Sequence, residues 1–114
     1  MLEITTLRND NILFIDICGD LDASSSIKLD KVLDEAKNNK EKSVLINCAK
    51  LNYISSAGLG VFMSYIEDYK QNGTYFCLYG LSEKVKNVFA LLGLEKLIKI
   101  FNTEDDARNA NNIN

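Results

Sequence analysis

Two serines and two glycines stand close together in residues 52–62, which read NYISSAGLGVF. Apolar residues precede them and residues at helical spacing follow, so the stretch indicates a strand that passes directly into a helix. The first backbone amides of a helix have no partners within the helix, and Ser55 or Ser56 is well suited to cap them. Glycine costs about 1 kcal/mol relative to alanine inside a helix, so Gly58 and Gly60 need a further reason. They serve either tight packing against the sheet or the close approach of another molecule.

Strands and helices alternate along the rest of the chain. Two opening strands are predicted over Leu2 to Leu7 and Ile12 to Cys18, joined by the tight turn RNDN. The further predicted elements are a helix from about Ala23 to Lys37, a strand over Val44 to Asn47, a helix from the serine-glycine stretch to Gly73, a strand over Tyr75 to Tyr79, a helix from Ser82 to Gly93, a strand over Leu97 to Phe101 and a short helix capped by Thr103.

This order, ββαβαβαβα, predicts an α/β fold in one domain. Strands that alternate with helices pair in parallel through right-handed crossovers, here behind an antiparallel opening hairpin. We expect a mixed, mostly parallel sheet of about five strands with about four helices. The domain is predicted over residues 1–110, and the Asn-rich end, residues 111–114, is expected to fray.

Apolar periodicity indicates which side chains face the core. The positions that recur at helical spacing, and are expected inside, are Leu29, Val32, Leu33, Ala36, Leu59, Phe62, Met63, Ile66, Val85, Val88, Phe89 and Leu92. Leu91 and Leu94 are likewise better explained by core packing than by a partner surface. Asp22 or Ser24 is expected to cap the first helix.

Composition excludes several classes of function. The 114 residues include no histidine, so neither a Ser-His-Asp or Cys-His mechanism nor a zinc site with histidine ligands can be built. A formal net charge of -3 argues against a nucleic-acid surface, which needs clustered Lys and Arg. The three cysteines, Cys18, Cys48 and Cys77, lie in apolar runs without a CxxC spacing and are expected to be buried free thiols.

The chain also carries no pattern of membrane insertion or export. No segment approaches the roughly 18 apolar residues of a membrane helix, and the N-terminus has no basic region followed by an apolar one. We therefore expect a cytoplasmic protein without a membrane partner.

Three motifs of enzymes or nucleotide-binding proteins can be compared with the serine-glycine stretch. A nucleophile elbow needs GxSxG, and a phosphate-binding P-loop needs GxxxxGK followed by Ser or Thr; both are absent. The dinucleotide fingerprint GxGxxG is half present at Gly58 and Gly60, but Met63 occupies the third glycine position. A nucleotide-binding domain remains an alternative.

Two motifs together carry a resemblance to a known family. GDLD closes the second predicted strand at residues 19–22, and YISSAGLGVF follows at residues 53–62. The pair resembles the STAS domain family, in particular its small stand-alone anti-sigma factor antagonists, and the similarity extends over nearly the whole chain. In that family the motif is commonly Asp-Ser-Ser/Thr-Gly-Leu-Gly, with the serine after the aspartate phosphorylated. The resemblance places the phosphoacceptor at Ser56, while Ser55 stands where the family often has Asp and is the second candidate.

The resemblance implies a switch in protein binding rather than an enzyme. In its unphosphorylated form the chain would capture an anti-sigma factor and free the sigma factor. The anti-sigma factor is itself a serine kinase that would end the capture, a serine phosphatase would reset it, and ATP would be bound by the kinase, with no cofactor in this chain. The implied partner surface comprises Asp20, Asp22, Ser24, Ser55, Ser56, Ala57, Gly58, Leu59 and Gly60. From the residues alone, Asp22 caps a helix and Asp20 is solvated at a strand end. An adaptor in a lipid or anion transport assembly is a further alternative.

Overall fold

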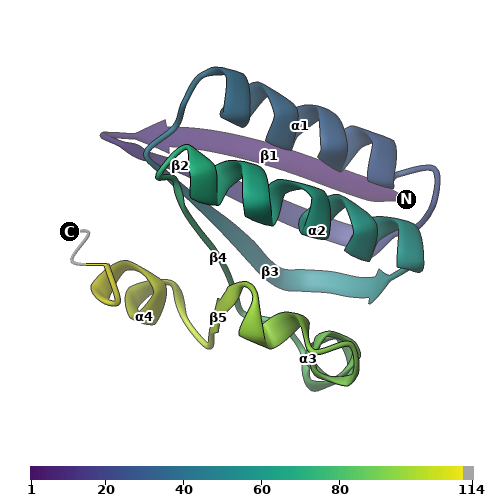
Figure 1. Ribbon diagram of the computed structural model, residues 1–114. Helices are drawn as coiled ribbons and strands as arrows, with labels where there is room; N and C mark the ends of the chain where they lie inside the picture. The colour runs from purple at the N-terminus through teal and green to yellow at the C-terminus, as the bar shows by residue number, and fades with distance from the viewer. Residues whose placement is uncertain (112–114) are drawn as a thin grey trace.

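The computed structural model describes residues 1–111 and confirms the predicted order of elements, ββαβαβαβα (Figure 1). The strands of this part of the chain are β1 (Leu2–Asn9), β2 (Ile12–Leu21), β3 (Ser43–Ile54), β4 (Tyr75–Tyr79) and β5 (Lys99–Phe101). Its α-helices are α1 (Ser26–Asn38), α2 (Ser56–Gln71), α3 (Glu83–Leu91) and α4 (Glu104–Asn109), and a 3₁₀ turn covers Leu94–Lys96.

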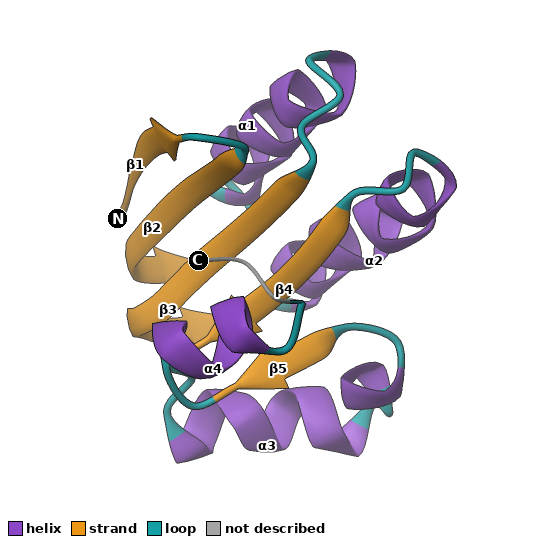
Figure 2. Cartoon of the chain, turned by 90° about the vertical axis from the view of Figure 1, so that its left-hand side faces the viewer, coloured by secondary structure: helices purple, strands orange, loops and turns teal. Residues whose placement is uncertain are grey.

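The five strands form one mixed sheet in the order β1-β2-β3-β4-β5. β1 and β2 pair antiparallel as a hairpin, and each later pair of neighbours is parallel. Helices α1 and α2 lie on one side of the sheet and α4 on the other (Figure 2). β2 and β3 are parallel neighbours, so their carboxyl ends lie side by side at the same end of the sheet. Helix α1 follows β2 and helix α2 follows β3, so the first turns of both helices lie at this end.

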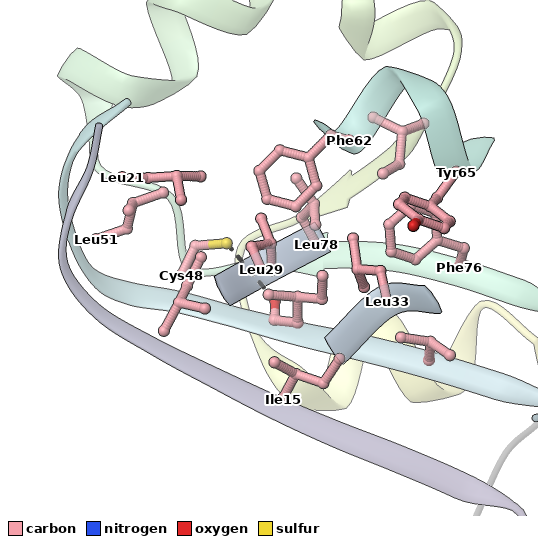
Figure 3. Packing of buried hydrophobic residues seen from close by; sticks show 14 of the residues in the cluster. Ile15, Leu21, Leu29, Leu33, Cys48, Leu51, Phe62, Tyr65, Phe76 and Leu78 are labelled. Atoms are coloured by element: carbon pink, nitrogen blue, oxygen red, sulfur yellow. Dashed lines mark hydrogen bonds between the residues drawn. The ribbon is translucent and has the colours of Figure 1, made fainter. Parts of the chain in front are cut away.

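The main core lies between the sheet and the helices α1, α2 and α3. Leu29 and Leu33 of α1 pack toward the sheet residues Ile15 and Leu78, beside Phe62 of α2 (Figure 3). These five side chains are fully buried, and each contributes about 1.5–3 kcal/mol of hydrophobic stabilisation. A smaller cluster lies on the opposite side of the sheet under α4, and its members are Ile12, Leu45, Cys77, Tyr79 and Ala107.

Hydrogen bonds from two tyrosines hold α2 against α1. The buried hydroxyl of Tyr69 donates to the carbonyl oxygen of Leu33 at 2.7 Å, and Tyr65 donates to Asp30, whose Oδ1 lies 3.0 Å away. Burial raises the pKa of the Tyr69 hydroxyl, so this group remains a donor at neutral pH. The two bonds tie the C-terminal half of α2 to α1.

Several predicted caps are confirmed. The hydroxyls of Ser82 and Thr103 accept hydrogen bonds from the amides of Val85 and Asp106, at the starts of α3 and α4. Gly73 and Gly93 follow α2 and α3 with φ of 72° and 70°, the left-handed region that favours glycine.

Several element boundaries differ from the prediction. α1 begins at Ser26 rather than about Ala23, because Asp22 draws residues 23–25 into turns before the helix. β3 extends to Ile54, far beyond the predicted end at Asn47, because pairing with β2 continues to the register pair Leu21 and Ile54. The last strand is only Lys99–Phe101, since it pairs with three residues of β4 and the chain before it forms the 3₁₀ turn.

Four side chains expected in the core are exposed. Cys18 is exposed because Ile15 and Ile17 face the main core, and strand alternation turns Cys18 to the other side of the sheet. Cys48 and Cys77 are buried free thiols, as predicted. Met63 is 49% exposed, because the inward stripe of α2 includes Phe62 and consecutive helical residues lie about 100° apart.

Two leucines at the end of α3 are the other side chains that were expected in the core and are exposed. Leu91 and Leu92 are 85% and 60% exposed, and only Leu94 is buried. The predicted periodicity assumed a helix that continued to Gly93, but α3 ends at Leu91, so Leu92 has left the helical repeat. Of the predicted tail, Asn111 lies at the end of the described residues and 112–114 lie outside them.

Candidate functional site

Two loops meet where β2 and β3 end. The backbone amide of Ser55 donates to the carbonyl oxygen of Leu21 at 2.8 Å, which joins the start of α2 to the end of β2. Leu21 and Ile54 are partners in the parallel register, so the bond continues the sheet by one residue. The GDLD loop is therefore held beside the serine-glycine turn, as expected from the sequence.

The two neighbouring serines have different environments. Ser55 has extended backbone angles (φ -90°, ψ 171°), and its Oγ accepts a hydrogen bond from the amide of Gly58 at 3.1 Å. It is thus the N-cap of α2, and its side chain is half-buried. Ser56 is the first helical residue and is exposed, and its hydroxyl has no hydrogen-bond partner within residues 1–111.

The first turn of α2 carries partial positive charge without an acidic residue of its own. Unpaired amides and the helix dipole amount to about half a positive charge at a helix start. Neither Ser56 nor the following residues Ala57 and Gly58 bring a carboxylate there. The exposed Ser56 hydroxyl therefore lies where an added anion is electrostatically tolerated.

Glycine stands at positions 58 and 60 of the motif for different physical reasons. A Cβ atom on Gly58 would lie 2.7 Å from Cγ of Leu21 and 3.1 Å from Cγ1 of Ile54. The space beside Gly58 is thus filled by the protein's own core. A Cβ atom on Gly60 would meet no atom within 4 Å. The packing explanation therefore applies to Gly58 and does not apply to Gly60.

Asp22 organises the loop that precedes α1. Its Oδ1 accepts hydrogen bonds from the backbone amide of Ser25 at 2.9 Å and from the hydroxyl of Ser24 at 3.0 Å, and Ser25 Oγ lies 2.9 Å away. The Ser25 amide, followed by the two hydroxyls, lowers the pKa of Asp22 to about 2. Asp22 thus shapes the turn as a carboxylate. The N-cap position of α1 belongs to Ser25, so the prediction that Asp22 or Ser24 caps this helix is wrong.

The predicted site residues divide by exposure. Those exposed to solvent are Ser24, Ser56 and Ala57; those half-buried are Asp20, Asp22, Ser55 and Gly60; those buried are Gly58 and Leu59. Leu59 belongs to the main core cluster. The structure brings the exposed and half-buried residues to the same end of the molecule and turns Gly58 and Leu59 inward.

Three residues at this end were not singled out from the sequence. Ser25 is buried and lies within hydrogen-bond distance of both Asp22 and the carbonyl oxygen of Asp20. The spacing Asp-x-x-Ser at positions 22 and 25 is the signal that could have identified it. Ile27, in the first turn of α1, is 72% exposed, and Tyr53, next to Asp20 in the sheet register, is 48% exposed. Ile27 lies outside the inward stripe that continues at Leu29 and Leu33, which is the signal for its exposure. No periodicity distinguishes Tyr53 from a core position.

Comparison with known proteins assigns the chain to a family. Residues 3–107 match the family model for the STAS domain. The chain belongs to the STAS domain family. A curated relative, the anti-sigma-B factor antagonist of Staphylococcus epidermidis, is 28% identical over 99 residues, covering 87% of this chain and 92% of the relative.

Solved structures share the fold of this STAS domain. A candidate anti-sigma factor antagonist from Thermotoga maritima superposes with a TM-score of 0.88 at 23% identity, over 94% of this chain and 92% of that one. The unphosphorylated form of the anti-sigma factor antagonist SpoIIAA superposes with a TM-score of 0.82 at 18% identity, over 98% and 99% of the two chains. At these identities the structural likeness establishes the STAS fold. Within residues 1–111, none of the helices has the length and apolar character needed to cross a bilayer.

Proposed function

We propose that this STAS domain is an anti-sigma factor antagonist whose binding is switched by phosphorylation of Ser56. In its unphosphorylated form it captures an anti-sigma factor, which releases the sigma factor and changes transcription without contact between this chain and DNA. The names of its relatives support the class of function. The observation that carries the proposal is the exposed Ser56 hydroxyl at the first turn of α2, next to a serine that is already used as the cap.

The division of roles between the serines favours Ser56 as acceptor. An incoming kinase needs a hydroxyl that is accessible and free to be deprotonated, and Ser56 meets both requirements. Ser55 is half-buried, and its Oγ is bound to the Gly58 amide, so phosphorylation there disturbs the cap. Ser55 is therefore the second candidate.

Electrostatics explains how one phosphate can change binding without unfolding the domain. A phosphoserine adds a charge of about -1.5 to -2, and a helix N-terminus stabilises such an anion by roughly 0.3–2 kcal/mol. A partner carboxylate about 5 Å from a single phosphate charge, at an effective dielectric constant of about 20, is repelled by about 3 kcal/mol. That repulsion corresponds to more than about a hundredfold in affinity. The loss at the interface thus exceeds the gain within the domain.

The proposed partner surface surrounds Ser56. Asp20 and Asp22 lie on the neighbouring loop, which the Ser55–Leu21 hydrogen bond holds in place. The residues proposed to contact the partner are Asp20, Asp22, Ser24, Ser55, Ser56, Ala57 and Gly60. Gly58 and Leu59 contribute by shaping the turn from inside, because both are buried.

The other components of the switch belong to partner proteins. The anti-sigma factor is proposed to be the serine kinase and to bind ATP, and a serine phosphatase returns Ser56 to the hydroxyl. This chain supplies the acceptor and the surface, has no catalytic step and holds no cofactor, and it acts in the cytoplasm.

Mass spectrometry tests the proposal directly. The chain is incubated with ATP and, in turn, each anti-sigma kinase encoded in the same genome, and then analysed by intact mass and peptide mapping. We expect the gain of one phosphoryl group, confined to Ser56. Ser56→Ala should remain unmodified and still bind the kinase, whereas Ser56→Asp should keep the fold and bind weakly. Full phosphorylation of Ser56→Ala would show that Ser56 is not the sole acceptor.

A further inference from the structure

We propose that the anti-sigma factor also packs along the outer face of α2, with one of its segments seated over Gly60 and against Met63. This inference rests on the proposed function and extends its surface from the loop to the second turn of the helix. Met63 becomes a specificity-determining residue of the interface, although its spacing alone predicted a core position.

Helical geometry places the three residues in one row. Residues four and seven positions apart lie on the same face of an α-helix, so Gly60 and Met63 follow Ser56 along α2. The rise per residue puts Gly60 about 6 Å and Met63 about 10 Å from Ser56 along the helix axis. Ser56 and Met63 are exposed and Gly60 is half-buried, so the row faces outward.

Gly60 leaves a notch in this row that the fold does not fill. The position its Cβ would take has no atom within 4 Å, unlike that of Gly58, where Leu21 and Ile54 occupy the space. Glycine is unfavourable inside a helix, and the packing of this chain offers no compensation at position 60. Close approach of a second molecule to the bare backbone would explain why glycine stands at position 60.

Met63 borders the notch with an apolar side chain that the core does not need. Its neighbours Leu59 and Phe62 are buried and carry the packing of this part of α2, while Met63 is 49% exposed. Methionine is unbranched and polarizable, and it adapts to the surface of a partner. An apolar partner side chain over Gly60 would therefore be enclosed on one side by Met63.

The arrangement connects the notch to the switch. A phosphate on Ser56 would lie about one helical turn from Gly60, within the Debye length of about 8 Å at physiological ionic strength. A partner segment in the notch is thus within reach of the charge and bulk of the phosphate. Phosphorylation would displace the same segment that Gly60 admits.

Calorimetric titration of the unphosphorylated chain with its anti-sigma factor tests the inference. Met63→Ala should weaken binding about tenfold, and Gly60→Ala should weaken it about tenfold while raising the melting temperature. Leu7→Ala is the matched control: Leu7 is 67% exposed on β1, away from α2, and its truncation should leave the affinity unchanged. The double variant should lose less than the product of the two single losses, because both residues contact one segment.

The outcomes separate this inference from the proposed function. Wild-type affinity in both Met63→Ala and Gly60→Ala would overturn the inference and leave the proposed function standing. If the loss of affinity in the double variant equals the product of the two single losses, Gly60 and Met63 do not contact one shared segment, and that part of the inference is overturned. Failure of the wild-type chain to bind any anti-sigma factor of its genome would overturn both proposals.

Discussion

Replacing Gly58 with alanine should destabilise the protein, although alanine is the better helix former. The new Cβ would lie 2.7 Å and 2.8 Å from Cγ and Cδ2 of Leu21 and 3.1 Å from Cγ1 of Ile54. Leu21 is fully buried, so it cannot swing into free space. Overpacking of this kind costs about 1–3 kcal/mol, against about 1 kcal/mol gained in helix propensity. The free energy of unfolding should fall by up to about 2 kcal/mol.

Gly60→Ala is the matched control, because it adds the same methyl group two residues later in the same helix. Its new Cβ meets nothing within 4 Å, so only the gain of about 1 kcal/mol remains. The two variants should differ by the overpacking cost alone, about 1–3 kcal/mol, or about 4–12 °C in melting temperature for a domain of this size. Thermal and urea unfolding followed by circular dichroism measures both. Equal stability of the two variants would refute the packing role of Gly58.

Three further results are expected. Asp22→Asn should be less stable than the wild type at pH 7, and the difference should shrink as pH falls to about 2. The lowered pKa means that the carboxylate stabilises the fold above about pH 4 and that this contribution is lost as pH falls through about 2, which urea unfolding at both pH values checks. A thiol reagent should modify Cys18 in the folded protein but Cys48 and Cys77 only after unfolding, because burial raises the pKa of both, that of Cys77 to about 11; labelling of all three at the same rate would contradict their burial. Asp20→Asn should change the affinity for the anti-sigma kinase without changing the melting temperature, and an unchanged affinity would remove Asp20 from the site.

The order of elements could be predicted because each element carries a local signal. The caps Ser82 and Thr103 and the glycines after α2 and α3 stand where the chain must start or stop a helix. The far end of β3 could not be predicted, since Lys50 and Asn52 interrupt its apolar pattern. That part of the strand exists because β2 offers it backbone partners, a tertiary effect that a local pattern does not contain.

Exposure was the less predictable property of single side chains. Helical spacing identifies a stripe but not its centre, so Met63 was assigned to the core together with its neighbour Phe62. An apolar strand residue such as Cys18 can face either a helix layer or open solvent, and the choice depends on where α4 covers the sheet.

For the candidate site, the sequence supplied the two motifs and the structure separated the roles within them. The pattern Ser-Ser left open which serine caps α2, and the geometry assigns that task to Ser55. Two glycines that look alike in the sequence proved different, because only Gly58 has a neighbour, Leu21, distant in the chain. The part played by Ser25 depends on the folded turn around Asp22.

The central claim concerns the effect of one phosphate on Ser56. Its most direct test is a calorimetric titration of the anti-sigma factor with the unmodified chain and with the chain phosphorylated at Ser56, at the same salt concentration. We predict that phosphorylation lowers the affinity at least about a hundredfold while the melting temperature of the domain stays the same or rises. Equal affinities for the two forms would contradict the claim.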